Sequence, residues 1–433
     1  MTATIPRLSA DRPRHAVGSA HTAGAARATA ALRVNAFVRV ALYAYVLSIP
    51  FEWPERTIPI EIPTLVGTFL LVAALVQPSA CFRRVPAAVL LFVAHLWVLG
   101  IAAVLNGPDH PDLIAELFVW LVQVILLFWI VFNLLADERA LRGVLLALVA
   151  ACTVRAALQF LGVAATVYEE WTGGERVTIL GQNANLSAMI LAAGLAAVLG
   201  LHVSATGSPL RRLGIITWPI AAVLGAAIIQ TGSRGGLLSA GVAGVALLFS
   251  SRASRRRLRN GVLAVVAVVL LGWGASRSEV MRGRFEAAAE AGQLAGRERI
   301  YPKLLEMFAE RPVLGWGPID NQFEVARRIN KPGRPRTDAH NLVLEVLTTS
   351  GLVGTLPFLA GIALCLRGAW RARRGPLGVV PLAILAAVLT NTVTGTWVVA
   401  KIVWLALAIA LAAGAHWTPD PARAPGRSSP CAD

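Results

Sequence analysis

Side chains that could bind charge or move a proton gather in four short stretches of the sequence. The stretches are 174–185, 231–236, 296–299 and 337–341, and their candidate residues are Arg176, Asn183, Asn185, Ser233, Arg234, Arg297, His340 and Asn341. Arginine suits bidentate binding of phosphate oxygens, and a glycine-flanked Ser-Arg turn leaves backbone N–H groups open to an anion. Three arginines beside glycine turns therefore predict an anion site. Each arginine taken alone also fits a surface charge that is solvated or reaches lipid headgroups.

His340 is the histidine best placed to handle a proton in such a site. It follows Asp338, a residue type that caps helix N-termini, and begins an apolar segment. The helix dipole disfavours the imidazolium there, so we expect a neutral ring that can accept a proton. The alternative is a histidine that only caps the helix. Asn341 and Glu345 share one face below it, and a carboxyl inside an apolar segment is a functional candidate.

Other kinds of chemistry have no matching pattern in the sequence. No Asp-x-Asp or His-x-x-x-His pair beside these residues suggests a divalent metal, and no Walker or GxGxxG sequence indicates a nucleotide cofactor. The four cysteines predict neither a disulfide framework nor a metal site. Arginines with one histidine fit group transfer from a pre-activated diphosphate donor. We therefore expect no metal and no cofactor.

The elements that must position these residues are membrane-spanning helices. The 433 residues are 56% hydrophobic and 15% charged, against about 25% charged in ordinary soluble domains. Apolar runs of roughly 20 residues fit helices that cross about 30 Å of hydrocarbon, and strand-period alternation is missing. This composition excludes a soluble enzyme. We predict an all-α polytopic membrane protein with twelve spans, near 35–50, 60–76, 86–105, 113–135, 143–163, 184–203, 213–230, 235–250, 261–275, 341–366, 376–393 and 397–414.

The net charge of +16 is explained by the orientation of these spans. With the N-terminus in the cytoplasm, the short inner loops hold fifteen arginines, whereas the short outer loops hold only Arg56, Arg176, Arg234 and Lys401. This positive-inside bias places both termini in the cytoplasm. It also accounts for most of the basic excess, so we expect no nucleic-acid partner.

The predicted domain organisation has two tails, two groups of spans and one long loop. We expect disordered cytoplasmic tails at 1–33 and 415–433, spans one to nine in 34–275, an extracytoplasmic loop at 276–340 and spans ten to twelve in 341–414. The first 33 residues lack the apolar region of a signal peptide. In the loop, Arg284–Leu294 is helix-prone, and Ile300, Leu304 and Phe308 form one stripe on a second helix that ends before Pro312. We expect two or three short helices that form a lid over the outer ends of the bundle.

The clusters together resemble the O-antigen ligase and polymerase superfamily of bacterial membrane glycosyltransferases. The resemblance rests on the Ser-Arg-Gly-Gly turn at 233–236 and on the Arg-x-x-x-Leu-Gly-Gln-Asn-Ala-Asn run at 176–185. It rests further on Gly296-Arg297, on Arg311-Pro-Val-Leu-Gly-Trp-Gly317, and on Ala339-His340-Asn341 before Gly351-Leu-Val-Gly354. The specific motifs lie in 176–354. One departure is Gln182-Asn183-Ala184, where the family often has a proline before the second asparagine.

The resemblance implies a GT-C-like helical fold that acts at the outer face of the bacterial inner membrane. The implied reaction moves a glycan from undecaprenyl diphosphate to an acceptor hydroxyl on a lipid or glycan, with inversion and without a metal. It assigns His340, Arg234 and Arg297 to catalysis. Substrate binding falls to Arg176, Asn183, Asn185, Ser233 and Asn341, and membrane lipids surround the chain.

Two alternatives stay open at this point. Within the same superfamily the chain could polymerise repeat units or glycosylate another acceptor, protein included. In a different class, twelve spans could form a polysaccharide transporter. Transporters show internal repeats, broken helices and ionisable residues near the midplane. The sequence has no clear repeat, although Arg155 inside the fifth span is an ionisable residue of that kind.

Overall fold

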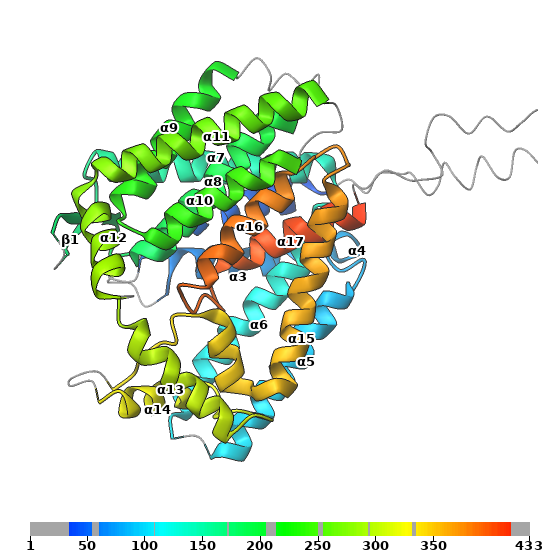
Figure 1. Ribbon diagram of the computed structural model, residues 1–433. Coiled ribbons are helices and arrows are strands. Elements are labelled where there is room, and N and C mark those ends of the chain that lie inside the picture. Colours follow the sequence, from blue (N-terminus) through cyan, green and yellow to red (C-terminus); the bar gives the residue numbers. More distant parts are fainter. Residues whose placement is uncertain are drawn as a thin grey trace, which may run out of the picture. The chain divides into compact units, whose positions relative to one another are not determined.

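The computed structural model of the chain is mostly helical. It describes residues 34–53, 60–107, 109–170, 173–204, 214–249, 254–292, 295–330 and 335–416. Sixteen α-helices, two 3-10 turns and one two-stranded hairpin lie within these residues (Figure 1). The predicted tail 1–33, and all but the first two residues of the predicted tail 415–433, lie outside the described residues.

The elements follow one another as short or long helices with few breaks. Up to the hairpin they are α2 (Ala36–Ser48), η1 (Ile49–Phe51), α3 (Ile62–Ala74), α4 (Pro78–Cys81), α5 (Ala87–Asn106), α6 (Pro111–Leu134) and α7 (Glu138–Phe160). The hairpin consists of β1 (Ala165–Glu169) and β2 (Glu175–Ile179). After it come α8 (Ala184–Ser204), α9 (Gly214–Gln230), α10 (Arg234–Ala246), η3 (Leu247–Phe249), α11 (Ser254–Arg277), α12 (Glu279–Ala291), α13 (Arg297–Glu310), α14 (Asp320–Arg328), α15 (Leu342–Ala372), α16 (Val380–Thr392) and α17 (Lys401–His416).

A helix occupies each of the twelve apolar segments predicted from the sequence. Within the described residues, five are long and apolar enough to cross a membrane, namely α5, α6, α7, α8 and α15. The pair α11 and α12, bent by 89°, makes a sixth if it is counted as one span. The remaining segments form shorter apolar helices of 10–17 residues. The membrane-protein class is therefore supported, and twelve crossings stay a prediction.

The helices share one large apolar core. α15 packs against α5 and α17, α16 packs against α8 and α10, and α17 packs against α6. Fully buried aromatic and aliphatic side chains such as Tyr45, Phe92 and Phe128 fill the space between them. In contrast, Trp97, Val104 and Leu258 on the outer helix faces are mostly exposed. Apolar side chains on both faces are what a helix between protein and lipid requires.

The antiparallel hairpin β1–β2 was not predicted. Tyr168 pairs with Arg176, and Gly173 and Gly174 in the connection both have positive φ. A Cβ on Gly174 would lie 2.7 Å from the backbone nitrogen of Val280, so the turn packs directly against the start of α12. The mostly helical structure is consistent with the predicted all-α class, and this one small hairpin sets Arg176 beside α12.

The segment 276–340 contains three short helices, α12, α13 and α14. Figure 1 shows α12 beside the end of α11, with α13 and α14 further along next to each other. Ile300, Leu304 and Met307 of α13 are buried together with Val325 and Ala339. The predicted stripe is confirmed at its first two positions. Met307 replaces Phe308 as the third buried side chain, because i, i+4, i+7 follows a helix face more closely than i, i+8.

Helix α15 is broken at Gly351, and the loop between α13 and α14 repairs the break. Gly351 has φ 57° and ψ −161°, which no helix contains. The backbone nitrogens of Trp316 and Gly317 donate to the carbonyls of Thr348 and Thr349 at 2.8 and 3.0 Å. In return, the carbonyls of residues 312 and 313 accept from the nitrogens of residues 352 and 353 at 2.8 and 3.2 Å. Four backbone groups of α15 that the break leaves without a helical partner are thereby paired.

This close approach predicts that Gly315 tolerates no side chain. A Cβ there would lie 2.5 Å from the Thr348 carbonyl oxygen, at φ +71°. Gly292 is a matched control, because it has φ +61° and open space around its Cβ position. We expect Gly292→Ala to cost about 1–2 kcal/mol, the usual penalty of a left-handed residue. Gly315→Ala should remove most of the folded protein. Thermal unfolding in detergent, followed by tryptophan fluorescence, measures the stability of both variants. An equal loss of stability in the two would contradict the close approach of Gly315 to the break of α15.

Candidate functional site

Four arginines from four different elements line one cavity. Arg176 comes from β2, Arg234 from the first turn of α10, Arg284 from α12 and Arg297 from the first turn of α13. The cavity has a volume of about 370 Å³ and is also lined by Glu170, Asn185, Ala287, Ala295, Gly296, Glu298 and His340. We call it the arginine cavity. Three of the predicted anion-binding residues therefore meet, and Arg284 joins them.

Glu170 holds two of the four arginines. Its Oε1 accepts from Arg176 at 3.1 Å and also from Arg284. The side chains are 14% (Glu170), 16% (Arg176) and 11% (Arg284) exposed, so the three charges are largely withdrawn from water. One carboxylate between two guanidinium groups leaves the group of three with a positive charge that a bound anion could neutralise.

Three further arginine contacts are with carbonyl oxygens. Arg176 Nε donates to the Thr231 carbonyl, Arg234 to the carbonyl of Arg284, and Arg297 to that of Thr394, each at 2.8 Å. Burial lowers the pKa of Arg176 to about 10, with the neighbouring Arg284 as the next cause. Burial likewise lowers the pKa of Arg297. With a pKa of about 10, Arg176 stays cationic at neutral pH, and carbonyl contacts orient the guanidinium groups without neutralising them.

The predicted asparagines and serine make helix-capping contacts beside the cavity. Ser233 is the N-cap of α10, where its Oγ accepts from the Gly236 nitrogen at 3.0 Å and donates to Asn185 Oδ1 at 2.8 Å. Asn183 accepts from the backbone nitrogen of Asn185 at 2.8 Å. Asn341 caps α15 through the nitrogens of residues 343 and 344. Among these four, Asn185 lines the arginine cavity. Substrate contacts by the others stay a prediction.

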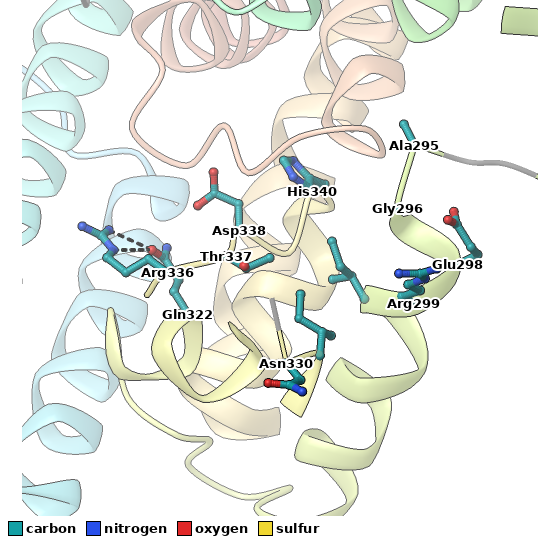
Figure 2. A pocket seen from close by; sticks show the side chains of 12 residues that line it. Ala295, Gly296, Glu298, Arg299, Gln322, Asn330, Arg336, Thr337, Asp338 and His340 are labelled. Carbon is teal, nitrogen blue, oxygen red and sulfur yellow. Dashed lines mark hydrogen bonds between the residues drawn. The ribbon is translucent and has the colours of Figure 1, made fainter. Parts of the chain in front are cut away.

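His340 stands at the boundary between the arginine cavity and a second cavity. Its backbone has φ +50°, and its carbonyl accepts from the Tyr301 hydroxyl at 3.2 Å. The N-cap of α15 is Asn341 and not Asp338, so His340 precedes the helix instead of lying in its first turn. The predicted position of the N-cap was wrong by three residues, because an asparagine closer to the apolar run makes the capping hydrogen bonds. Figure 2 shows the imidazole beside Asp338 and above Thr337, at the edge of the second cavity.

The second cavity is larger and mixed in charge. Its volume is about 640 Å³, and we call it the polar cavity (Figure 2). It is lined by Ala295, Gly296, Glu298, Arg299, Ile300, Gln322, Ile329, Asn330, Arg336, Thr337, Asp338 and His340. Four of these residues, Ala295, Gly296, Glu298 and His340, line the arginine cavity as well. His340 can therefore reach a molecule in either space.

An apolar groove adjoins the arginine cavity. It has a volume of about 640 Å³ and shares Asn185, Arg234, Arg284 and Arg297 with that cavity. Beyond these polar residues it is lined mainly by apolar side chains of α10, α11 and α12, among them Leu237, Leu238, Val268, Leu271 and Phe285. The arrangement suits an amphiphile whose anionic group binds arginine and whose tail lies along the helices.

A buried polar network holds the 180–187 segment in place. Arg155 of α7 is fully buried and donates to Gln159, Gln182 and Ser187 at 3.2, 3.0 and 2.6 Å. Gln182 Nε2 in turn donates to the carbonyls of residues 50 and 52. The ionisable residue that suggested transport therefore anchors the chain just before Asn185.

A family model described as O-antigen ligase matches residues 219–359. This match supports assignment of the chain to the O-antigen ligase and polymerase superfamily. The matched segment contains Arg234, Arg284, Arg297, His340 and the break of α15, whereas the hairpin with Arg176 lies before it. The family implies an enzyme of the membrane, glycosyltransferase-like, with a lipid-linked glycan donor and an acceptor in general. No curated protein matches the chain.

Sequence reasoning missed Glu170 and Arg284. A hairpin signal was present, because Thr166, Val167 and Tyr168 precede a Gly-Gly turn that is followed by Val177, Thr178 and Ile179. That signal would have placed Glu170 near Arg176. Arg284 had no comparable signal, because only the 89° bend between α11 and α12 turns it toward the cavity.

The contact geometry predicts a specific consequence of Glu170→Gln. Two buried guanidinium groups would lose their carboxylate, and removal of one partner of a buried pair typically costs about 3–5 kcal/mol. We expect the variant to unfold at a lower temperature, and pyrophosphate to raise its unfolding temperature more than that of the wild type. Glu138→Gln is the control, because Glu138 forms an exposed pair with Arg142. If pyrophosphate raised the unfolding temperatures of the wild type and of Glu170→Gln by the same amount, this role of Glu170 would be contradicted.

Proposed function

We propose that the protein is an inverting, metal-independent O-antigen ligase-like glycosyltransferase. It moves a glycan from undecaprenyl diphosphate to an acceptor hydroxyl at the outer face of the bacterial inner membrane. The observation that carries this proposal is the position of four arginines between an apolar groove and His340. The family match in this part of the chain supports it.

The donor fits the groove and the arginine cavity by its chemistry. A polyprenyl diphosphate joins a long apolar tail to an anion with several phosphate oxygens. The tail would lie against α10 and α11, and the diphosphate would meet Arg176, Arg234, Arg284 and Arg297. Arginines that are already held by Glu170 and by carbonyl oxygens need little rearrangement when the anion arrives.

The reaction is a single displacement at the anomeric carbon of the donor sugar. The acceptor oxygen forms a bond to that carbon while the bond from carbon to diphosphate oxygen breaks, and this inverts the configuration. The diphosphate leaves with the electron pair, and the acceptor proton passes to the His340 imidazole. Negative charge grows on the leaving oxygens, so the arginines stabilise the transition state more than the ground state.

The segment 276–340 supplies much of this site, because it carries Arg284, Arg297 and His340. We propose that it forms a lid at the outer membrane surface, with both chain termini in the cytoplasm. A polymerase that joins repeat units is the alternative within the superfamily, since the same donor and the same displacement serve both reactions.

Substitution of the proposed catalytic residues should abolish transfer and leave the fold intact. We expect Arg234→Ala, Arg297→Ala and His340→Ala each to reduce the rate by about 100-fold or more, as the loss of one charge-stabilising donor does elsewhere. Arg327→Ala is the control, because Arg327 of α14 is 74% exposed and pairs with Glu324. Purified variants in liposomes with a lipid-linked glycan would be assayed for a new glycosidic bond. Normal transfer by the arginine and histidine variants would refute the site.

A deletion strain distinguishes ligase from polymerase. A ligase should leave lipid-linked polymer unattached, so surface glycolipid without added glycan is expected on a gel. A polymerase would instead leave single attached repeats. The proposal of a ligase predicts the first pattern, and the second would assign the alternative.

A further inference from the structure

The polar cavity contains binding groups that the donor does not use. Gln322 of α14 links three parts of its wall. Its Oε1 accepts from Arg336 at 2.8 Å, its Nε2 donates to Glu345 of α15 at 3.2 Å, and its carbonyl accepts from the Thr337 nitrogen at 3.1 Å. Figure 2 shows the Arg336 and Gln322 side chains joined at one side of the cavity, with Thr337 and Asp338 between them and His340. These hydrogen bonds therefore hold the wall of the cavity in a defined arrangement.

The polar cavity differs from the arginine cavity in its balance of charge. The arginine cavity has four arginines against Glu170 and Glu298, which leaves it positive. The polar cavity has Arg299 and Arg336 against Glu298 and Asp338, which balances it. A diphosphate is therefore favoured in the first, and a molecule without net charge in the second.

Two buried hydroxyl groups beside Gln322 have no hydrogen-bond partner among the described residues. Thr337 is 8% exposed, lines the polar cavity, and its Oγ1 is one of them. The other is Thr396 Oγ1, in a cavity of about 220 Å³ that shares Gln322, Arg336 and Asp338 with the polar cavity. A buried polar atom without a partner costs free energy. Both oxygens are nearly inaccessible in this structure, so the Thr337 side chain would have to rotate for its hydroxyl to meet a ligand in the cavity, and the hydrogen bond formed there would remove that cost.

We propose that the polar cavity is the acceptor subsite and that it binds an uncharged sugar unit of a saccharide acceptor through Gln322, Thr337 and Asp338. Sugar hydroxyls both donate and accept hydrogen bonds. They can donate to the Asp338 carboxylate and either donate to or accept from the Gln322 amide and the Thr337 hydroxyl. A volume of about 640 Å³ lies in the range of small-molecule sites. The bound sugar would present a hydroxyl to His340 from the side opposite the diphosphate. This assignment rests on the proposed function.

Thr337→Val tests the subsite without disturbing the fold. Valine has nearly the shape of threonine, and the lost hydroxyl makes no hydrogen bond within the described residues. We expect thermal stability to be equal or higher. The acceptor concentration at half-maximal rate should rise about five- to tenfold, the effect of one lost hydrogen bond to a ligand. The corresponding donor concentration and the maximal rate should not change. Thr337→Ser keeps the hydroxyl and should restore the wild-type value.

The assay uses the full-length protein in liposomes with a lipid-linked glycan donor. The acceptor probe is the oligosaccharide that mild acid releases from the surface glycolipid of the deletion strain. Asp338→Asn should raise its half-saturating concentration as Thr337→Val does, and Glu306→Gln, an exposed change on α13, should not. Unchanged acceptor saturation in the Thr337 and Asp338 variants of a transferring enzyme would overturn the subsite. Transfer only to a serine- or tyrosine-containing peptide would overturn the saccharide assignment. No transfer by the wild type would overturn the proposed function itself.

Discussion

The break of α15 at Gly351 and its repair by residues 312–317 determine where the side chains of the candidate site lie. A helix interrupted in apolar surroundings leaves backbone N–H and C=O groups unpaired, and each costs several kcal/mol there. Here a loop from the same chain pairs four of them. That loop directly follows α13, which begins with Arg297, and directly precedes α14, which carries Gln322. His340 lies just before α15. These backbone hydrogen bonds therefore hold α13 and α14 in a fixed position relative to α15.

The dominant electrostatic feature of the candidate site is that four positively charged side chains lie close together. Four guanidinium groups around one cavity repel one another, and their partial burial removes water that would screen them. Glu170 relieves part of the repulsion, while the carbonyls of Thr231, Arg284 and Thr394 each accept one hydrogen bond from an arginine. The favourable free energy of folding offsets the unfavourable free energy of bringing these charges together before any ligand binds. An anion bound there gains from charge already in place, which is the physical basis of electrostatic preorganisation.

Periodicity and composition predicted the positions of the helices, because burial in an apolar phase imposes the same hydropathy on every such segment. The glycine-flanked arginine stretches, the single nearby histidine and the family resemblance predicted that Arg176, Arg234, Arg297 and His340 belong to one site, and these four line one cavity. Their predicted roles in binding and catalysis stay predictions. Features that depend on contacts between distant segments were out of reach. The helix break required knowledge that residues 312–317 approach Gly351. Arg284 required the bend at Ser278, and the cap at Asn341 competed with a nearby Asp338 that looked equally suitable.

The broken helix also bears on the choice between an enzyme and a transporter. In transporters, interrupted helices leave backbone carbonyls and half-helix ends free to coordinate the transported substrate or ion. In α15, the carbonyls of Thr348 and Thr349 and the nitrogens of residues 352 and 353 already bond to the 312–317 loop. These bonds occupy both nitrogens and one acceptor site on each of the two carbonyls, so the chain's own backbone holds the break. Arg155, the other feature suggestive of transport, is bonded to Gln159, Gln182 and Ser187. Both features stabilise the fold, and the charged groups that face cavities lie beside His340, where they suit a transfer reaction between two bound molecules.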